Sequence, residues 1–433
     1  MNLTEEQVLA LAPDESSKKS GKELANAAKW VSRGTYQQAL WGECKGSGSK
    51  PYQTQIDTAQ LSFKCSCPSR KFPCKHGLGL MILYTRDQTG FQQEVGPDWV
   101  QAWLGKRAET AEKKAAKVDK PVDEAAQAKR LHARHAKVTQ GAEELMLWMK
   151  DILRNGILTV PEKPYTFWEN MRKRMVDAQA NGLANMVQQL ENTPFYQEGW
   201  QTVFLQQMVD IYLLLQGYKN IEQLSPAFQS DVLARIGFTQ SQDELKNMPG
   251  VEDDWLVLAK TCTEDGNITT ERFWLRGVNT GQYAMVLNFI VRGQVNSMLL
   301  APGAFIHAEL VFYPSVLPLR AIVKSHTALH RELPIKGVQT WMDVAMAQTQ
   351  AREQYPFSQE AAFVVEALTP LQFNNEWWLR DQNSNLMRIP SYFSAQWHLL
   401  ALSGGLPLKM AVVGKEDTYL PLGVWHQDKY ITV

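Results

Sequence analysis

The sequence has few features of secreted or membrane proteins. Only five of its 433 residues are cysteines, which is too few for an extracellular disulfide framework and fits a reducing compartment better. Glu5 and Glu6 stand where a secretory signal would need basic residues. No apolar run reaches the roughly 18 residues of a membrane span, because the best candidate, residues 299–323, contains His307 and Glu309. We therefore predict a cytoplasmic protein without a membrane segment.

Common catalytic motifs are also missing. The sequence contains no Walker-type phosphate loop and no Gly-x-Ser-x-Gly nucleophile elbow. His326 and His330 are four residues apart, but no glutamate follows the first histidine as a zinc protease motif requires. We predict that the chain is not an enzyme and identify no small-molecule substrate. An unrecognised site in the C-terminal region stays open as an alternative.

The charges balance overall but not along the chain. The 45 basic and 45 acidic side chains cancel, and the 44% hydrophobic and 21% charged content is typical of a globular protein. Residues 1–140 nevertheless carry 22 basic and 15 acidic side chains, a net charge of +7, so the remainder carries −7. Different partners for the two parts and an attraction between them are both compatible with this asymmetry.

The pattern predicts a multidomain α+β protein. Residues 105–140 lack aromatic residues and indicate a charged helical linker broken at Pro121, between an N-terminal region over 1–104 and the rest. Apolar residues at helical spacing predict an α-helical domain over 141–250, in which the apolar segment 203–215 would be central. Short runs rich in β-branched and aromatic residues predict an α+β domain over 251–433, dominated by antiparallel strands with helices near 338–353 and 391–402.

Three of the five cysteines lie within ten positions. Cys65, Cys67, Cys74 and His76 form the pattern Cys-x-Cys, six residues, Cys-x-His, which supplies the four ligands of a closed tetrahedral Zn²⁺ site. Flanking segments predict a small ββα-like module in which the second pair stands at the start of a helix. Cysteines that are merely buried are a weaker alternative, given this spacing. A redox pair is also weaker, because Cys-x-Cys neighbours make a strained disulfide.

With four protein ligands the zinc would have no open position, so we expect it to hold the fold rather than activate water. Loss of one ligand should then unfold the module and leave distant domains intact. Cys44 is expected to pack in the core instead of binding metal, and Cys262 has no ligand neighbours in the sequence.

At these residues the sequence resembles the bacterial SWIM-type zinc finger proteins. The resemblance covers roughly residues 30–85 and is carried by LWGECKGSGSKPYQ and FKCSCPSRKFPCKHGLGL. It implies that Cys65, Cys67, Cys74 and His76 are the Zn²⁺ ligands. It also implies an interaction module associated with binding to DNA and to proteins, without an enzymatic activity of its own.

Basic residues surround the predicted zinc ligands. Lys64, Arg70, Lys71 and Lys75 would form a phosphate-contacting surface, although a solvated rim of the small module is the simpler interpretation. We interpret His132 with His135, and Arg172 to Arg174, as solvated surface. The acidic run from Glu252 to Asp254 is interpreted as a turn surface rather than a magnesium site. We therefore expect a zinc-binding recognition protein whose partner is DNA, RNA or a protein, with a pure protein adaptor as the alternative.

Overall fold

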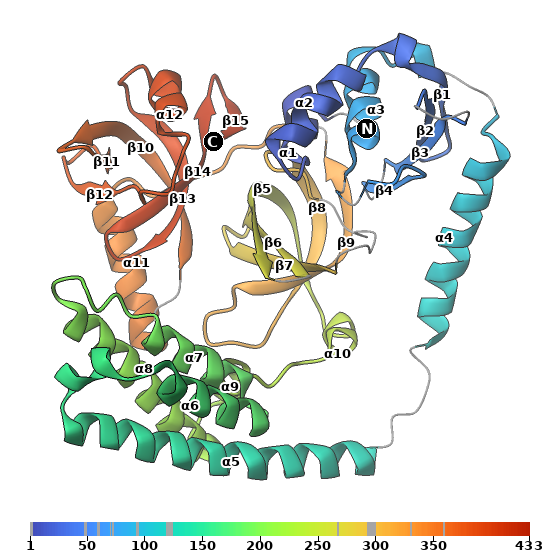
Figure 1. The fold of residues 1–433 in the computed structure, drawn as a ribbon. Coiled ribbons are helices and arrows are strands. Elements are labelled where there is room, and N and C mark those ends of the chain that lie inside the picture. Colours follow the sequence, from blue (N-terminus) through green and yellow to red (C-terminus); the bar gives the residue numbers. More distant parts are fainter. Residues whose placement is uncertain are drawn as a thin grey trace. The chain divides into compact units, whose positions relative to one another are not determined.

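The structure is a computed structural model that describes residues 3–46, 50–58, 61–69, 71, 73–91, 95–117, 124–265, 268–291, 300–329, 331–357 and 360–433. These residues form a mixed α+β fold with three sheets (Figure 1). The chain divides into two compact units, one with residues 1–116, 248–313 and 319–433 and one with residues 117–247 and 314–318. Within the described residues, every helix is too short or too polar to cross a bilayer.

The first unit begins with a four-stranded antiparallel sheet in the order β1-β2-β3-β4. Alternate residues of its strands point to opposite faces, so Leu40 packs toward α3 while Trp41 packs toward α4. The elements are α1 (Glu5–Ala10), α2 (Glu15–Leu24), η1 (Ala27–Lys29), β1 (Trp30–Tyr36), β2 (Ala39–Cys44), β3 (Tyr52–Asp57), β4 (Ser62–Cys65), α3 (Lys75–Arg86), η2 (Thr89–Phe91) and α4 (Asp98–Lys117).

The second unit is a bundle of helices around an apolar core. Helix α9 shows how its ends are specified: Ser225 accepts a bond from the amide of Phe228, Pro226 occupies the first helical position, and Gly237 ends the helix at φ 118°. The helices are α5 (Glu124–Asn155), η3 (Ile157–Glu162), α6 (Tyr165–Asp177), α7 (Asn181–Glu191), α8 (Trp200–Lys219), η4 (Ile221–Gln223), α9 (Pro226–Ile236) and α10 (Gln242–Lys246).

The chain then returns to the first unit as a closed five-stranded barrel in the order β5-β6-β7-β9-β8. Its neighbouring strands are antiparallel except for the parallel pair β7–β9. Trp255, Phe273 and Val286 fill its interior. The strands are β5 (Val251–Asp265), β6 (Ile268–Gly277), β7 (Tyr283–Val291), β8 (Phe305–Phe312) and β9 (Arg320–Leu329).

A six-stranded sheet completes the first unit in the order β12-β11-β10-β13-β14-β15. One face packs against the outside of the barrel, where Val364 and Ala411 meet Trp274. The other face packs against the two helices of this region. The elements are α11 (Trp341–Gln354), β10 (Ala361–Phe373), β11 (Glu376–Arg380), β12 (Leu386–Arg388), α12 (Gln396–Ser403), β13 (Leu408–Lys415), β14 (Thr418–His426) and β15 (Lys429–Thr432).

The N-terminal module and the barrel share one apolar core. Ala301 and Ala304, which precede β8, are buried among residues of α1, α3 and the first sheet. Two hydrogen bonds join the same parts: the Gln7 amide donates to the carbonyl of Gly303 (3.0 Å), and Lys260 donates to the carbonyl of Leu11 (3.3 Å).

This division differs from the domains expected from the sequence. Residues 1–104 and most of 251–433 lie in one unit, and the expected boundary between 140 and 141 falls inside α5. The end of α4 and the start of α5 occupy the expected linker, while Pro121 lies outside the described residues. Barrel closure depends on strand pairing over long sequence separations, which local patterns do not encode.

Two local expectations are corrected. The acidic run from Glu252 to Asp254 lies inside β5, not on a turn, and Asp253 is buried there. Helix α8 is not enclosed as its apolar sequence predicted, because one of its faces packs in the bundle while several apolar residues of the other are exposed.

Candidate metal centre

The first pair of predicted ligands lies at the end of β4. Cys65 is the last residue of this strand and pairs with Thr54 of β3, whose hydroxyl oxygen lies 3.3 Å from Cys65 Sγ. Beyond the strand, the Ser66 amide donates to the carbonyl of Gln53 (2.9 Å), and the Gln53 amide donates to Ser66 Oγ (2.9 Å). These bonds fix the start of the segment that carries Cys67.

The second pair lies at the start of α3. Cys74 is the N-cap residue, and its carbonyl accepts the amide of Leu78 (3.1 Å). His76 follows in the first turn, is 4% exposed, and packs its ring 4.9 Å from that of Tyr52. A Cβ at Gly77 would lie only 2.8 Å from the ring of Phe63, so glycine lets the helix start approach β4.

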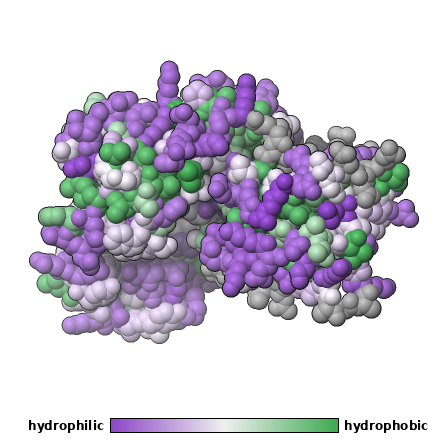
Figure 2. Space-filling model, turned by 90° about the horizontal axis from the view of Figure 1, so that it is seen from above, coloured by the Kyte–Doolittle hydropathy of each residue, from purple (hydrophilic) through white to green (hydrophobic). Residues whose placement is uncertain are grey.

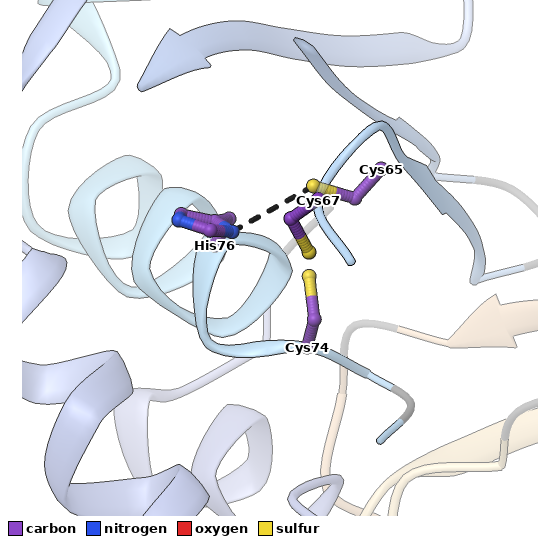
Figure 3. Close-up of side chains that lie close together, drawn as sticks. All are labelled: Cys65, Cys67, Cys74 and His76. Atoms are coloured by element: carbon purple, nitrogen blue, oxygen red, sulfur yellow. Dashed lines mark hydrogen bonds between the residues drawn. The ribbon is translucent and has the colours of Figure 1, made fainter. Parts of the chain in front are cut away.

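The four side chains converge from the two elements, as Figure 3 shows. Their ligand atoms all lie within 4.8 Å of one another, and Cys65 Sγ lies 3.7 Å from His76 Nδ1. Ordinary tetrahedral Zn–S and Zn–N bond lengths place a sulfur and a nitrogen about 3.6 Å apart, so this pair already has the required separation. Cys74 and His76 are buried, and the other two cysteines are half-buried.

The close contacts change the acidity of the four groups. Hydrogen bonds with Cys65 and Cys74 lower the pKa of Cys67, whereas bonds with Cys65 and Cys67, together with burial, raise the pKa of Cys74. Burial would lower the pKa of His76, but the neighbouring sulfurs of Cys65 and Cys67 outweigh it and raise the pKa to about 9. Zn²⁺ is bound by thiolates and a neutral imidazole, so its binding displaces the protons of these groups.

Three thiolates and one imidazole are the donor set of a closed structural zinc site. In a comparison with protein families, the SWIM zinc finger model matches residues 52–84, and the model of the SWIM-associated four-helix bundle domain matches residues 133–236. The chain therefore contains a SWIM zinc finger and a SWIM-associated four-helix bundle domain. Zn²⁺ is its cofactor, as the resemblance implied. Comparisons with curated proteins and with solved structures found no match.

The two family matches follow the helices and strands of the structure. The finger match runs from the first residue of β3 into α3 and contains all four clustered side chains. The bundle match begins at Ala133 inside α5 and ends with α9 at Ile236. The sequence indicated the finger from its ligand spacing, but apolar periodicity alone gave no indication that the helical region belongs with it.

Among the described residues, the basic side chains expected around the finger do not all lie beside the ligands. Lys64 pairs with Gln55, which bonds to the carbonyl of Trp99, so it points toward α4 and away from the ligands. Lys71 forms an ion pair with Asp14 (2.7 Å). Lys75 is exposed in the first turn of α3. Arg70 lies outside the described residues.

The other cysteines and histidines that the sequence analysis considered lie outside the metal cluster. Cys44 is buried in the core of the module, and burial, the largest effect, raises the pKa of its thiol. Tyr52 and Thr54 contact the cluster but carry no sequence signal that would have identified them. Cys262 is exposed on β5. His326 is half-buried on β9, where burial lowers its pKa, and His330 lies outside the described residues.

Two surface interpretations change in detail. His135 is not merely solvated, because its Nδ1 lies 2.9 Å from the Tyr218 hydroxyl and its ring stacks on Phe238. His132 is exposed, as expected. The basic cluster on α6 forms ion pairs of Arg172 with Glu191, Lys173 with Glu169 and Arg174 with Glu144.

Proposed function

We propose that this chain is a non-catalytic recognition protein whose zinc finger binds nucleic acid through lysines beside the metal site. In this proposal Cys65, Cys67, Cys74 and His76 hold the zinc, which maintains the fold and leaves no coordination position for a reacting water. The cytoplasm, a reducing compartment, would keep the three thiols available as ligands.

One observation supports the nucleic-acid partner. Lys75 lies between two of the four clustered residues, is exposed, and has no ion pair among the described residues. Lys29 is also exposed. The charges of Lys75 and Lys29 both lower the pKa of the Cys44 thiol, although burial outweighs them, so both lysines lie near Cys44.

Lys45 extends the same group of cations. Its ammonium donates to the carbonyl of Ala28 (3.1 Å), and its amide donates to the carbonyl of Lys29 (2.8 Å). We call Lys29, Lys45 and Lys75 the lysine rim. A few cations on one side suit phosphate contacts, which supply affinity without reading the sequence of bases.

The lysine rim also has a structural explanation. A Zn²⁺ ion with three thiolates and a neutral imidazole has a net charge of about −1, which nearby ammonium groups stabilise. The two roles differ in their consequences: a structural rim changes zinc affinity, whereas a recognition rim changes nucleic-acid binding in protein that is fully loaded with zinc.

The outer face of the barrel is a less suitable nucleic-acid site than the finger. Closed five-stranded barrels with this kind of topology commonly bind oligonucleotides or oligosaccharides on one outer face. Here Trp274, Tyr283 and Met285 on that side pack against the C-terminal sheet, and the Tyr283 hydroxyl accepts the amide of Val364 (2.8 Å). We therefore assign recognition to the finger.

The test is fluorescence anisotropy of zinc-loaded protein with labelled DNA and RNA over a range of salt concentrations. We expect affinity to fall steeply with salt, and Lys75→Ala to reduce the slope of log K against log salt by about 1 with zinc content unchanged. Lys415→Ala removes an exposed lysine from the C-terminal sheet and should change neither. Salt-independent binding, or no binding to either nucleic acid, would refute the proposal and favour a protein adaptor.

A further inference from the structure

Helix α8 carries an apolar stripe on the face that the bundle leaves open. Leu205, Val209, Tyr212 and Leu213 follow one another at steps of four, three and one residues, and they are between 39% and 47% exposed. Phe204, Met208 and Ile211 on the opposite face are buried. A helix that is apolar on both faces is usually covered on both faces.

The stripe itself is uncharged, and Glu198 and Lys219 stand near its two ends. Between Glu198, which precedes the helix, and Lys219 at its end, Asp210 is the one charged residue of the sequence. Asp210 lies about 100° around the helix from Val209 and accepts a bond from Gln206 (3.2 Å). Glu198 and Lys219 are exposed, and neither forms an ion pair within the described parts of the chain.

We propose that α8 pairs with α8 of a second copy of this chain, antiparallel about a two-fold axis at Val209. Residues equally distant from Val209 then face each other, so that Leu205 meets Leu213 of the second copy and Val209 meets its own counterpart. Every apolar position of the stripe near the axis thus faces an apolar or uncharged position.

Charge complementarity selects this occupant and this direction. Val209 lies about midway between Glu198 and Lys219, so the antiparallel pair brings Lys219 of each copy to the level of Glu198 of the other. A parallel pair would instead oppose Lys219 to Lys219. The stripe is therefore complementary to itself in the antiparallel direction.

A groove beside the stripe enlarges the contact surface. It has a volume of about 650 Å³ and lies between α8 and α5, with Tyr212 and Leu215 on one wall and Met146 and Leu147 on the other. Leu147 is itself strongly exposed. Stable interfaces bury about 800 Å² per partner, which is more than a single helix face supplies. The α5 wall of the groove, with Met146 and Leu147, therefore belongs to the proposed interface.

The test is sedimentation velocity of the zinc-loaded full chain over a range of concentrations. We expect a monomer–dimer equilibrium in the micromolar range. Val209→Asp places two carboxylates at the axis and should abolish the dimer. Val203→Asp is the matched control: Val203 lies on the same helix and is 46% exposed against 47% for Val209, but it lies about 120° away around the helix, so the dimer should persist.

Reversal of the end charges tests the direction of pairing. Lys219→Glu should weaken the dimer roughly tenfold, because attraction at both ends becomes repulsion, and the double variant Lys219→Glu with Glu198→Lys should restore it. Circular dichroism establishes that each variant is folded. A monomer at every concentration, a dimer insensitive to Val209→Asp, or a double variant that stays as weak as Lys219→Glu would overturn the inference.

Discussion

Asp253 shows how a single buried carboxylate is stabilised in this fold. Its two oxygens accept bonds from the amides of Asp254, Asn279 and Thr280 and from the side chains of Asn279 and Thr280, at 2.6–3.1 Å. Burial alone would raise its pKa, but the bonds from Thr280 and Asn279 outweigh burial and lower it. The charged form is therefore the one that the folded chain favours.

Replacement of this carboxylate should cost stability. The pKa of Asp253 is lower in the folded than in the unfolded chain. Its contribution to the free energy of unfolding is therefore full above the ordinary carboxyl pKa, and it is lost as the pH falls through the pKa of the folded state. We expect Asp253→Asn to destabilise the first unit by about 1–3 kcal/mol at neutral pH and to weaken its acid dependence, measured by urea unfolding at several pH values. Asp428→Asn, at an exposed turn with φ 62°, should have little effect, and equal losses for both variants would contradict this account.

At the scale of elements, the close approach of α2 and α3 depends on small residues. A Cβ at Gly79 of α3 would lie 2.7 Å from Leu24 Cβ and 3.2 Å from the carbonyl oxygen of Gly21. At Gly105 of α4, by contrast, a Cβ would meet nothing within 4 Å. Both glycines lie inside helices, so alanine would favour the helix at each position, and only the packing distinguishes them.

The two glycine-to-alanine substitutions should therefore have opposite signs. We expect Gly105→Ala to stabilise the chain by about 0.5–1 kcal/mol through helix propensity. Gly79→Ala should destabilise the zinc module by about 1–3 kcal/mol, because overpacking forces α2 and α3 apart, and should weaken zinc binding. Thermal unfolding and a competition assay with a chromophoric chelator measure both effects. Stabilisation by both variants would show that the interhelical contact is not tight.

Local signals predicted some elements and missed others for physical reasons. Ser225, Pro226 and Gly237 specified α9 from both ends. Helix α7 has no such signal, because Ala180 at its N-cap offers no side-chain acceptor. Ser241 precedes α10 as a suitable N-cap residue, but its side chain makes no capping bond.

The metal cluster was predictable because its four residues lie within twelve positions of the sequence, whereas its surroundings were not. Cys-x-Cys and Cys-x-His spacing identified the four side chains. Tyr52 and Thr54 reach the cluster from β3 through strand pairing. The alternation of β4 also turned Lys64 away from the cluster, which a group of basic letters in the sequence did not reveal.

At the scale of the whole molecule, the zinc module is joined to the barrel by more than the chain. Ala301 and Ala304 are buried in the module's core, and the bonds from Gln7 and Lys260 connect the same parts. Lys260 is itself nearly buried and pairs with Glu271 (3.7 Å). The sequence led to the expectation of a strictly local effect of zinc loss, and this shared core changes that expectation.

Removal of zinc should therefore loosen part of the barrel as well as the finger. We expect chelation to increase amide hydrogen exchange in α3 and in residues 300–313, because both contribute to or adjoin the shared core, while α7 and α9 of the second unit stay protected. Hydrogen exchange with mass spectrometry, before and after chelation, measures this. Increased exchange confined to the finger would show that the shared core does not transmit the loss.

The central claim is that one zinc ion is held by Cys65, Cys67, Cys74 and His76. Elemental analysis of purified, tag-free protein tests it most directly, with Cys262→Ser as the control for a cysteine outside the cluster. We predict about one zinc per chain for the unchanged protein and for Cys262→Ser, and loss of zinc when Cys67 and Cys74 are both replaced by serine. Protein without zinc, or zinc retained in that double variant, would contradict the account.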